Sequence, residues 1–128
     1  MSIIHKSKSP LKIAKSLKDY WSPVIISEVN NFYVKVAKLK GTFVWHKHDE
    51  EDEMFMVLKG KLVIKFKKYK VKLKKGDTYV IPKGLWHNPV AKNECLVMLF
   101  EDKNTAHTGD TEHENSKSIE DQLSSYQS

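Results

Sequence analysis

The residues with the clearest potential for chemistry lie in the stretch WHKHDEEDE, residues 45–53, which holds two histidines and five acids. If residues 42–48 form a strand, its side chains alternate, and His46 and His48 then share one face with Cα atoms about 6.6 Å apart. Both rings could then converge on one metal ion. Glu53 follows after a short loop, and an antiparallel neighbouring strand would return its carboxylate toward the histidines. A carboxylate oxygen beside imidazoles suits a divalent first-row metal.

A third histidine, His87, follows the turn sequence PKGLWH and would complete a set of three imidazoles and one carboxylate if the segments converge. Periodicity alone does not establish that convergence. The four acids between His48 and Glu53 indicate a solvated loop between two strands rather than further ligands. The other histidines lie in polar stretches and are assigned no role: His5, His107 and His113.

Short apolar runs at close spacing surround these residues and are typical of β-strands. They cover residues 24–29, 32–40, 42–48, 53–59, 61–66, 69–74, 77–82 and 94–100. Turn-forming residues such as Asn30-Asn31 and Gly60 separate them. Ser9-Pro10 predicts the N-cap and first residue of a short helix that ends near Asp19. The sequence therefore predicts an all-β sandwich or barrel preceded by one short helix.

The length of 128 residues fits one domain. We expect an N-terminal helix and lead-in over residues 1–23, a β-barrel domain over 24–107, and a polar, disordered tail over 108–128. The single cysteine, Cys95, excludes an intramolecular disulfide and favours a reducing compartment. No secretory signal is recognised, so a cytoplasmic protein is expected, with a transit peptide as the weaker alternative for the basic, acid-free start. No apolar run approaches the ~20 residues that cross a bilayer, so no membrane partner is expected.

The net charge of +6 comes from lysine alone, because all 22 basic residues are Lys. Residues 59–75 hold nine of them and no acid. Recognition of phosphates and base edges favours Arg for its planar, bidentate geometry. A solvated outer sheet face with Lys at alternate positions is therefore favoured over a nucleic-acid surface, and no nucleic-acid partner is expected.

The spacing of these residues resembles that of a known family. Residues 41–60 closely resemble the first sequence motif of cupins, written Gly, five residues, His-x-His, three or four residues, Glu, six residues, Gly. This chain has one residue fewer between the first Gly and His46. Residues 76–87, GDTYVIPKGLWH, are similar to the second motif, although Ala91 occupies the position where an Asn usually ends it.

The resemblance covers roughly residues 32–100 and identifies a small single-domain cupin of the type labelled mannose-6-phosphate-isomerase-like. It implies a cupin barrel, that is, a double-stranded β-helix or jelly roll built of two antiparallel sheets. It also implies a divalent transition metal (Fe, Mn, Zn or Ni) held by His46, His48, Glu53 and His87. Such a centre has open positions for water or a small-molecule ligand.

The alternation of side chains also predicts which residues wall the pocket. Val44, Phe55 and Val57 share the faces of the expected ligands, and Tyr79 and Trp86 are further candidates. Tyr79 or an acid of the 49–52 loop could serve as a base, but no catalytic residue can be assigned. Trp86 belongs either to the pocket mouth or to the core.

The opposite faces of the same strands carry apolar residues that need cover: Phe43, Trp45, Met54, Met56 and Leu58. Such a patch is too large for the exposed surface of a monomer. Either the N-terminal helix and strand or a second copy of the chain must cover it. Small cupins commonly dimerise through sheet faces, so a homodimer is expected.

The function expected from these features is that of a metal-dependent enzyme acting on a small polar metabolite, either sugar-like or carboxylated. The resemblance includes isomerases and dioxygenases, and metal ligands alone do not choose between them. The alternative is a non-catalytic, metal-containing protein that binds a small ligand. A purely structural metal is disfavoured because structural zinc sites are usually closed and use thiolates.

Overall fold

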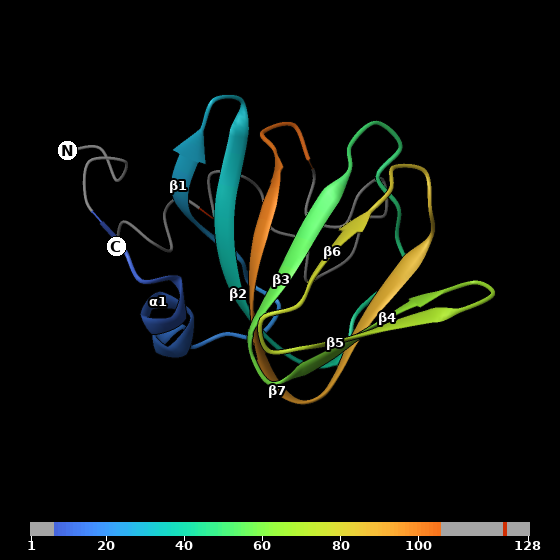
Figure 1. Cartoon of the computed structure of the whole chain (residues 1–128), viewed down its shortest axis with the longest axis horizontal. Coiled ribbons are helices and arrows are strands. Elements are labelled where there is room, and N and C mark those ends of the chain that lie inside the picture. Colours follow the sequence, from blue (N-terminus) through green and yellow to red (C-terminus); the bar gives the residue numbers. More distant parts are fainter. Residues whose placement is uncertain (1–6, 106–121, 123–128) are drawn as a thin grey trace.

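The computed structural model describes residues 7–105 and residue 122. The elements of this part are α1 (Pro10–Ser16), β1 (Val24–Val29), β2 (Phe32–Thr42), β3 (Glu53–Lys59), β4 (Lys61–Phe66), β5 (Lys70–Lys74), β6 (Thr78–Ile81) and β7 (His87–Asp102) (Figure 1). The predicted all-β class with a short N-terminal helix is confirmed. The predicted tail, 108–128, lies outside the described residues apart from Gln122, which is buried.

The seven strands form one antiparallel sheet that folds into two layers sharing β7. The larger layer has the order β1-β2-β7-β3-β6, while β4 pairs with β5 and with β7. Residues His87 to Val90 of β7 pair with β4, residues from Val90 onward pair with β2, and the last part of the strand also pairs with β3. Figure 1 shows the later part of β7 between β2 and β3, its earlier part beside β4, and the β4–β5 hairpin at a steep angle to β2 and β3. The chain therefore closes its interior between two layers joined by one strand.

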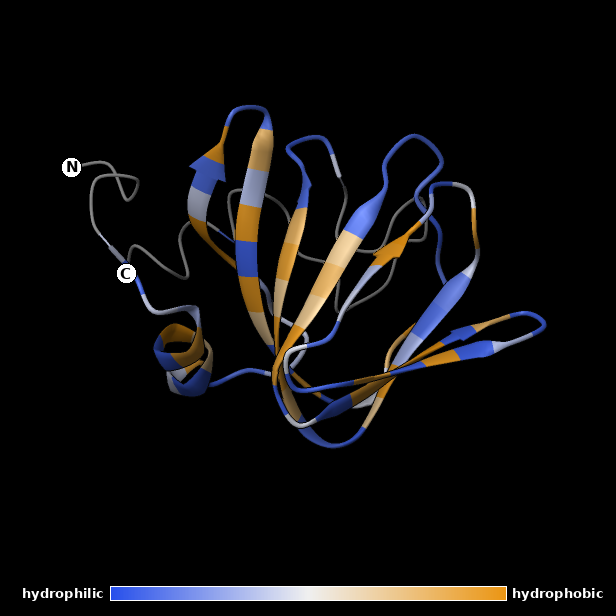
Figure 2. Cartoon of the chain, viewed as in Figure 1, coloured by the Kyte–Doolittle hydropathy of each residue, from blue (hydrophilic) through white to orange (hydrophobic). Residues whose placement is uncertain are grey.

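Alternating side chains fill that interior. Phe55 and Val57 of β3 point inward, and β4 pairs with β5 so that Leu62 lies opposite Leu73. Figure 2 shows hydrophobic residues along β3 and β7 and alternating hydrophobic and hydrophilic bands along β2. All nine lysines of residues 59–75 are exposed, as expected for a solvated sheet face.

The helix α1 begins as predicted but ends early. The Ser9 hydroxyl accepts a hydrogen bond from the Lys12 amide at 3.2 Å, which is the predicted N-cap. The expected end near Asp19 is wrong, because the Ser16 hydroxyl donates to the Ile13 carbonyl and Leu17 is already extended. The chain then runs on to pair Tyr20 with Lys38 in a parallel bridge.

The helix covers part of the outer sheet face. Its Ala14 is fully buried in a second apolar cluster with Val36 and Leu96, against which Leu58 and Met98 pack. The N-terminal helix is therefore one cover for the apolar patch expected on this face. Met54 and Met56, farther along β3, remain half-buried.

The segment 42–48 does not form the predicted strand. β2 ends at Thr42, and His46 makes an isolated antiparallel bridge with His87. The Phe43 amide donates to the Pro89 carbonyl and the His46 amide to the His87 carbonyl, both at 3.0 Å. The three residue steps from Phe43 to His46 thus lie opposite the two steps from Pro89 to His87, as in a β-bulge. The extra residue turns the side chains of Phe43 and His46 both inward. Phe43, assigned by alternation to the opposite face, is therefore buried.

The strand containing Pro89 was also missed. The predicted strand 94–100 belongs to β7, which begins at His87. Residues 87–93 carry a weak strand signal, since Pro89 cannot donate to a sheet ladder and polar residues follow it. Pro89 is accommodated because its carbonyl accepts from Phe43, a bond that needs no amide on the proline.

Two glycines in left-handed conformations provide a matched test of the fold. Gly60 has φ +88°, and an added Cβ would lie 2.8 Å from the Glu94 carbonyl oxygen, whereas Gly76 has φ +89° and no atom within 4 Å. Gly76→Ala should lower the free energy of unfolding by about 1 kcal/mol through backbone strain alone. Gly60→Ala should cost at least about 1 kcal/mol more, because backbone must also move. Urea unfolding measures both, and equal losses would contradict the close approach at Gly60.

Candidate metal centre

The four side chains predicted as metal ligands come together at one point of the interior. His46 and His48 come from the irregular segment after β2, Glu53 is the first residue of β3, and His87 is the first residue of β7. Their ligand atoms all lie within 4.8 Å of one another, and the four residues are buried, with 0% to 5% of their surface exposed. Three imidazoles and one carboxylate in this arrangement can hold a divalent transition metal.

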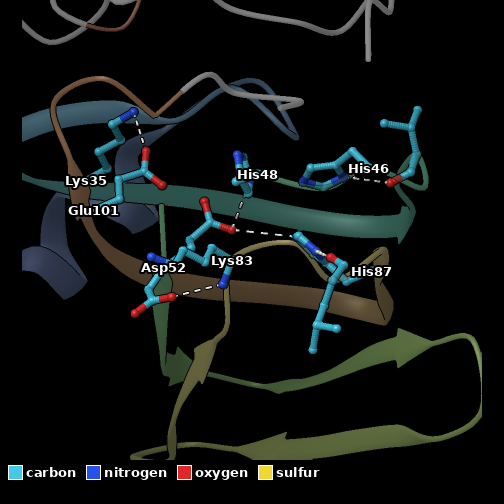
Figure 3. A network of polar contacts seen from close by, with 10 residues as sticks. Lys35, His46, His48, Asp52, Lys83, His87 and Glu101 are labelled. Carbon is cyan, nitrogen blue, oxygen red and sulfur yellow. Dashed lines mark hydrogen bonds and ion pairs between the residues drawn. The ribbon is translucent and has the colours of Figure 1, made fainter. Parts of the chain in front are cut away.

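The strand that carries Glu53 pairs with different neighbours from the one expected. The sequence suggested that its strand would pair with the histidine segment, but β3 pairs with β6 and β7 instead. Glu53 nevertheless lies close to two of the histidines, with its Oε1 3.6 Å from His48 Nε2 and 3.8 Å from His87 Nε2. Figure 3 shows the labelled histidines converging on this region from separate segments.

Backbone carbonyls fix the tautomers of two rings. His46 Nδ1 lies 2.9 Å from the Val44 carbonyl oxygen, and His87 Nδ1 lies 3.0 Å from that of Leu85. A carbonyl oxygen can only accept, so each Nδ1 carries the hydrogen and each Nε2 keeps its lone pair. His87 Nε2 is buried and has no hydrogen-bond partner within residues 7–105 and 122. Histidine ligands are commonly oriented in this way by a bond from the second ring nitrogen, so the residues fit a metal.

Main-chain bonds hold the surrounding loops in place. The His46–His87 bridge is completed by the His87 amide, which donates to the His46 carbonyl at 2.9 Å, and the Gly84 amide donates to the His48 carbonyl at 2.7 Å. In the acidic loop, Asp52 accepts from the Lys83 amide at 2.9 Å. At least one loop acid therefore ties the two ligand-bearing turns together instead of facing only solvent.

Burial sets the protonation of the site. Burial, with the neighbouring His87 as the next cause, lowers the pKa of His46 to about 4. Burial alone would raise the pKa of Glu53, but the neighbouring side chains of Glu101, His48 and His87 outweigh it and hold that pKa well below its usual range. The His46 ring is therefore neutral and the Glu53 side chain is a carboxylate, and these are the forms that bind metals.

A buried lysine–glutamate pair lies next to the centre. Lys35 Nζ is 2.5 Å from Glu101 Oε1, and both side chains are almost fully buried. Burial, and then the charge of Glu53, raise the pKa of Glu101 well above its usual range, although Lys35 opposes the shift. Glu101 and Glu53 are paired across β7 and β3. Lys35 contacts Glu101 Oε1, whereas Glu101 Oε2 is buried and has no hydrogen-bond partner among residues 7–105 and 122.

A cavity of about 40 Å³ adjoins these groups. Nine apolar residues line it together with Lys35, His46, Glu53 and Glu101. Trp21 forms part of its wall by stacking on Phe43 at 4.6 Å, and both of its nitrogens bind β2 carbonyls, those of Lys38 and Lys40.

The pocket-lining residues expected from alternation are found in different places. Phe55 lines the cavity, whereas Val44 and Val57 do not, Val57 being fully buried in the core. Tyr79 packs half-buried against that core, and Trp86 is 41% exposed, beside the ammonium groups of Lys47 and Lys67.

Four residues of this region were missed by sequence reasoning: Trp21, Lys35, Phe43 and Glu101. Lys35 did carry a signal, because it shares the strand phase of the inward-facing Ala37 and Leu39. Glu101 could not be found without the register that places it opposite Glu53.

The low pKa of His46 predicts how stability depends on pH. In the unfolded chain His46 titrates near ~6.5, and in the folded chain near about 4. The unfolded state therefore binds more protons in this interval, and stability falls as pH decreases from about 6.5 to about 4, by up to about 3 kcal/mol from this group. His46→Gln in the presence of EDTA should show a shallower decline in urea unfolding. An identical decline in both proteins would contradict the assignment.

The chain is similar in sequence and fold to known proteins. The sequence profile of the family described as "Cupin domain" matches residues 32–101. The Bacillus subtilis protein YdbB, described as uncharacterized, is 42% identical over 83 residues, which cover 64% of this chain and 74% of YdbB. A crystal structure of a cupin-2 domain containing protein from Shewanella frigidimarina has a TM-score of 0.73 and 40% identity, with 75% of this chain and 94% of that chain covered.

A more distant structure shares the fold alone. It is hydroquinone 1,2-dioxygenase PnpCD in complex with Cd²⁺ and 4-hydroxybenzonitrile, with a TM-score of 0.63, 15% identity and 79% of each chain covered. Within the described residues of the present chain, no helix has the length and apolar character needed to span a membrane.

Proposed function

The chain belongs to the cupin family, and from that premise we propose that it is a metal-dependent enzyme acting on a small polar metabolite, sugar-like or carboxylated. A divalent transition metal, Fe, Mn, Zn or Ni, would be held by His46, His48, Glu53 and His87. The single observation that carries this proposal is the convergence of these four buried side chains with their ligand atoms within 4.8 Å. No thiolate takes part, so the set differs from typical closed structural zinc sites.

The chemistry follows from the groups around the centre. A metal bound there would polarise a carbonyl or hydroxyl oxygen of the metabolite. Glu101 supplies the non-ligand acid or base that the motif segments lacked, because it lines the cavity and lies beside Glu53. The stacked rings of Trp21 and Phe43 wall the cavity and limit the entry of water. Isomerisation and dioxygenation both remain compatible with this set of residues.

Metal binding is tested by removing one ligand. Protein purified without added metal should contain about one transition-metal ion per chain, and Glu53→Gln should weaken binding by about 100-fold or more, since even changes to residues behind the ligands cost 10- to 100-fold. Elemental analysis and competition with a chromophoric chelator measure both quantities. Glu50→Gln, an exposed acid of the neighbouring loop, is the matched control and should leave affinity unchanged. A wild-type chain that stays metal-free after reconstitution would refute the centre.

The alternative is a metal-containing protein that binds a small ligand without turnover. The identity of the metal helps to separate the two. Iron or manganese accompanied by oxygen uptake would favour a dioxygenase, whereas zinc or nickel would leave isomerase and binding protein to be separated by product analysis. The Cd²⁺ complex of the distant dioxygenase is in keeping with a metal in this fold.

We also propose a homodimer in the cytoplasm, without a nucleic-acid or membrane partner. The buried, single Cys95 is in keeping with a reducing compartment, and burial raises the pKa of its thiol to about 12. The dimer is supported by the outer sheet face beyond α1. There Val80 is 49% exposed beside Met54, and Phe32, 37% exposed, stacks on Phe100.

The oligomeric state is measured by size exclusion with light scattering. The mass should be twice the 14.9 kDa of one chain, and Val80→Lys should shift it toward the monomer by placing a charge in the interface. Tyr69→Lys is the control, because Tyr69 is 52% exposed in the β4–β5 turn. A wild-type mass of one chain would exclude the dimer.

A further inference from the structure

The cavity beside the metal centre has a second polar end that the four candidate ligands do not explain. Of the four polar residues that line it, His46 and Glu53 belong to the metal centre, and the other two are Lys35 and Glu101. Figure 3 shows Lys35 and Glu101 on one side of His48 and the rings of His46 and His87 on the other. A small molecule in the cavity therefore meets a metal centre and a lysine–glutamate pair.

Lys35 is an unusual residue for an interior position. It is 1% exposed and lies on the inner face of β2, in phase with Ala37 and Leu39. Taking a lysine and a glutamate out of water costs several kcal/mol per ion, and an apolar pair of similar size is often as stable or more stable. Stability alone therefore does not account for this pair.

The ammonium group has bonding capacity left for a ligand. It carries three N–H donors. Within the part of the chain that the structure describes, Lys35 Nζ contacts Glu101 and makes no further hydrogen bond. At least one donor can therefore be directed toward an oxygen atom in the cavity that Lys35 lines.

The charges favour an anionic ligand over a neutral one. With a divalent cation in the centre and Lys35 beside it, at most two negative charges, those of Glu53 and Glu101, are present to balance three positive ones. Buried charge is stabilised by pairing, so a carboxylate would be drawn to this region. A polyhydroxylated sugar would bring no charge, and nine apolar lining residues would leave most of its hydroxyls without partners.

The size of the cavity restricts the ligand further. One water needs roughly 10 to 15 Å³ of such space, so a cavity of about 40 Å³ holds about three water-sized groups. That is the scale of a two- or three-carbon acid.

We propose that Lys35, held in place by Glu101, is the specificity-determining residue of the cavity and binds the carboxylate of a small organic acid. The acid's second oxygen faces the histidine centre. This inference rests on the proposed metal-dependent function and deepens it by choosing carboxylated over sugar-like ligands.

The test uses glycolate as the probe and ethane-1,2-diol, its reduced counterpart, as the uncharged control. Isothermal titration calorimetry of the zinc-loaded full chain should detect glycolate and not the diol. Lys35→Met should weaken glycolate binding by about ten- to a hundredfold, the range for a lost charge-assisted hydrogen bond. Lys38→Met, which removes a lysine from the outer face of the same strand, should leave binding unchanged.

A double variant separates a loss of glycolate binding from a loss of folding. Lys35→Met with Glu101→Gln leaves no unpaired charge at this position, so it should fold and still bind glycolate weakly. Equal affinity of glycolate for wild type and the Lys35 variants, equal binding of the diol, or no glycolate binding by the metal-loaded wild type would each overturn the inference. Metal content measured on the same samples distinguishes these results from failure of the metal centre. A wild type without metal would overturn both proposals.

Discussion

The structure depends on the pairing of β7 with three other strands. Because β7 pairs with β2 and β3 in one layer of the sheet and with β4 in the other, a single strand joins the two layers. Its first residue, His87, is a candidate ligand, and Glu101 near its other end contacts Lys35. Hydrogen bonds along one strand thus set the separation between the metal centre and the charged pair.

The interior carries an unusual amount of buried polarity for so small a core. Three histidines, two glutamates and a lysine are each at most 5% exposed. Without their partners such groups would destabilise the fold strongly. Some of these groups have partners: backbone carbonyl oxygens orient the rings of His46 and His87, and Lys35 pairs with Glu101. The chain maintains a polar site inside an apolar barrel, which is costly unless the site has a function.

The four candidate ligands could be predicted from the sequence because their spacing repeats two motifs of one family, and β1, β3 and β4 match their predicted bounds. The predictions that were wrong or missing concern residues whose positions are set by long-range strand pairing. Phe43 was assigned to the wrong face because an extra residue relative to β7 breaks the alternation. Lys35 and Glu101 were missed because charged residues are expected to face solvent, and only the register of β2, β7 and β3 places them inside.

The position of Trp21 affects where along the chain the functional part of the domain begins. It precedes β1 and the family match, which starts at residue 32, yet it forms a wall of the cavity and binds two carbonyls of β2. A minimal domain cut at that boundary would retain His46, Glu53 and the other candidate ligands while opening the cavity to solvent. Proteins and homology searches trimmed to the matched residues would therefore keep the four candidate ligands and lose one wall of the cavity.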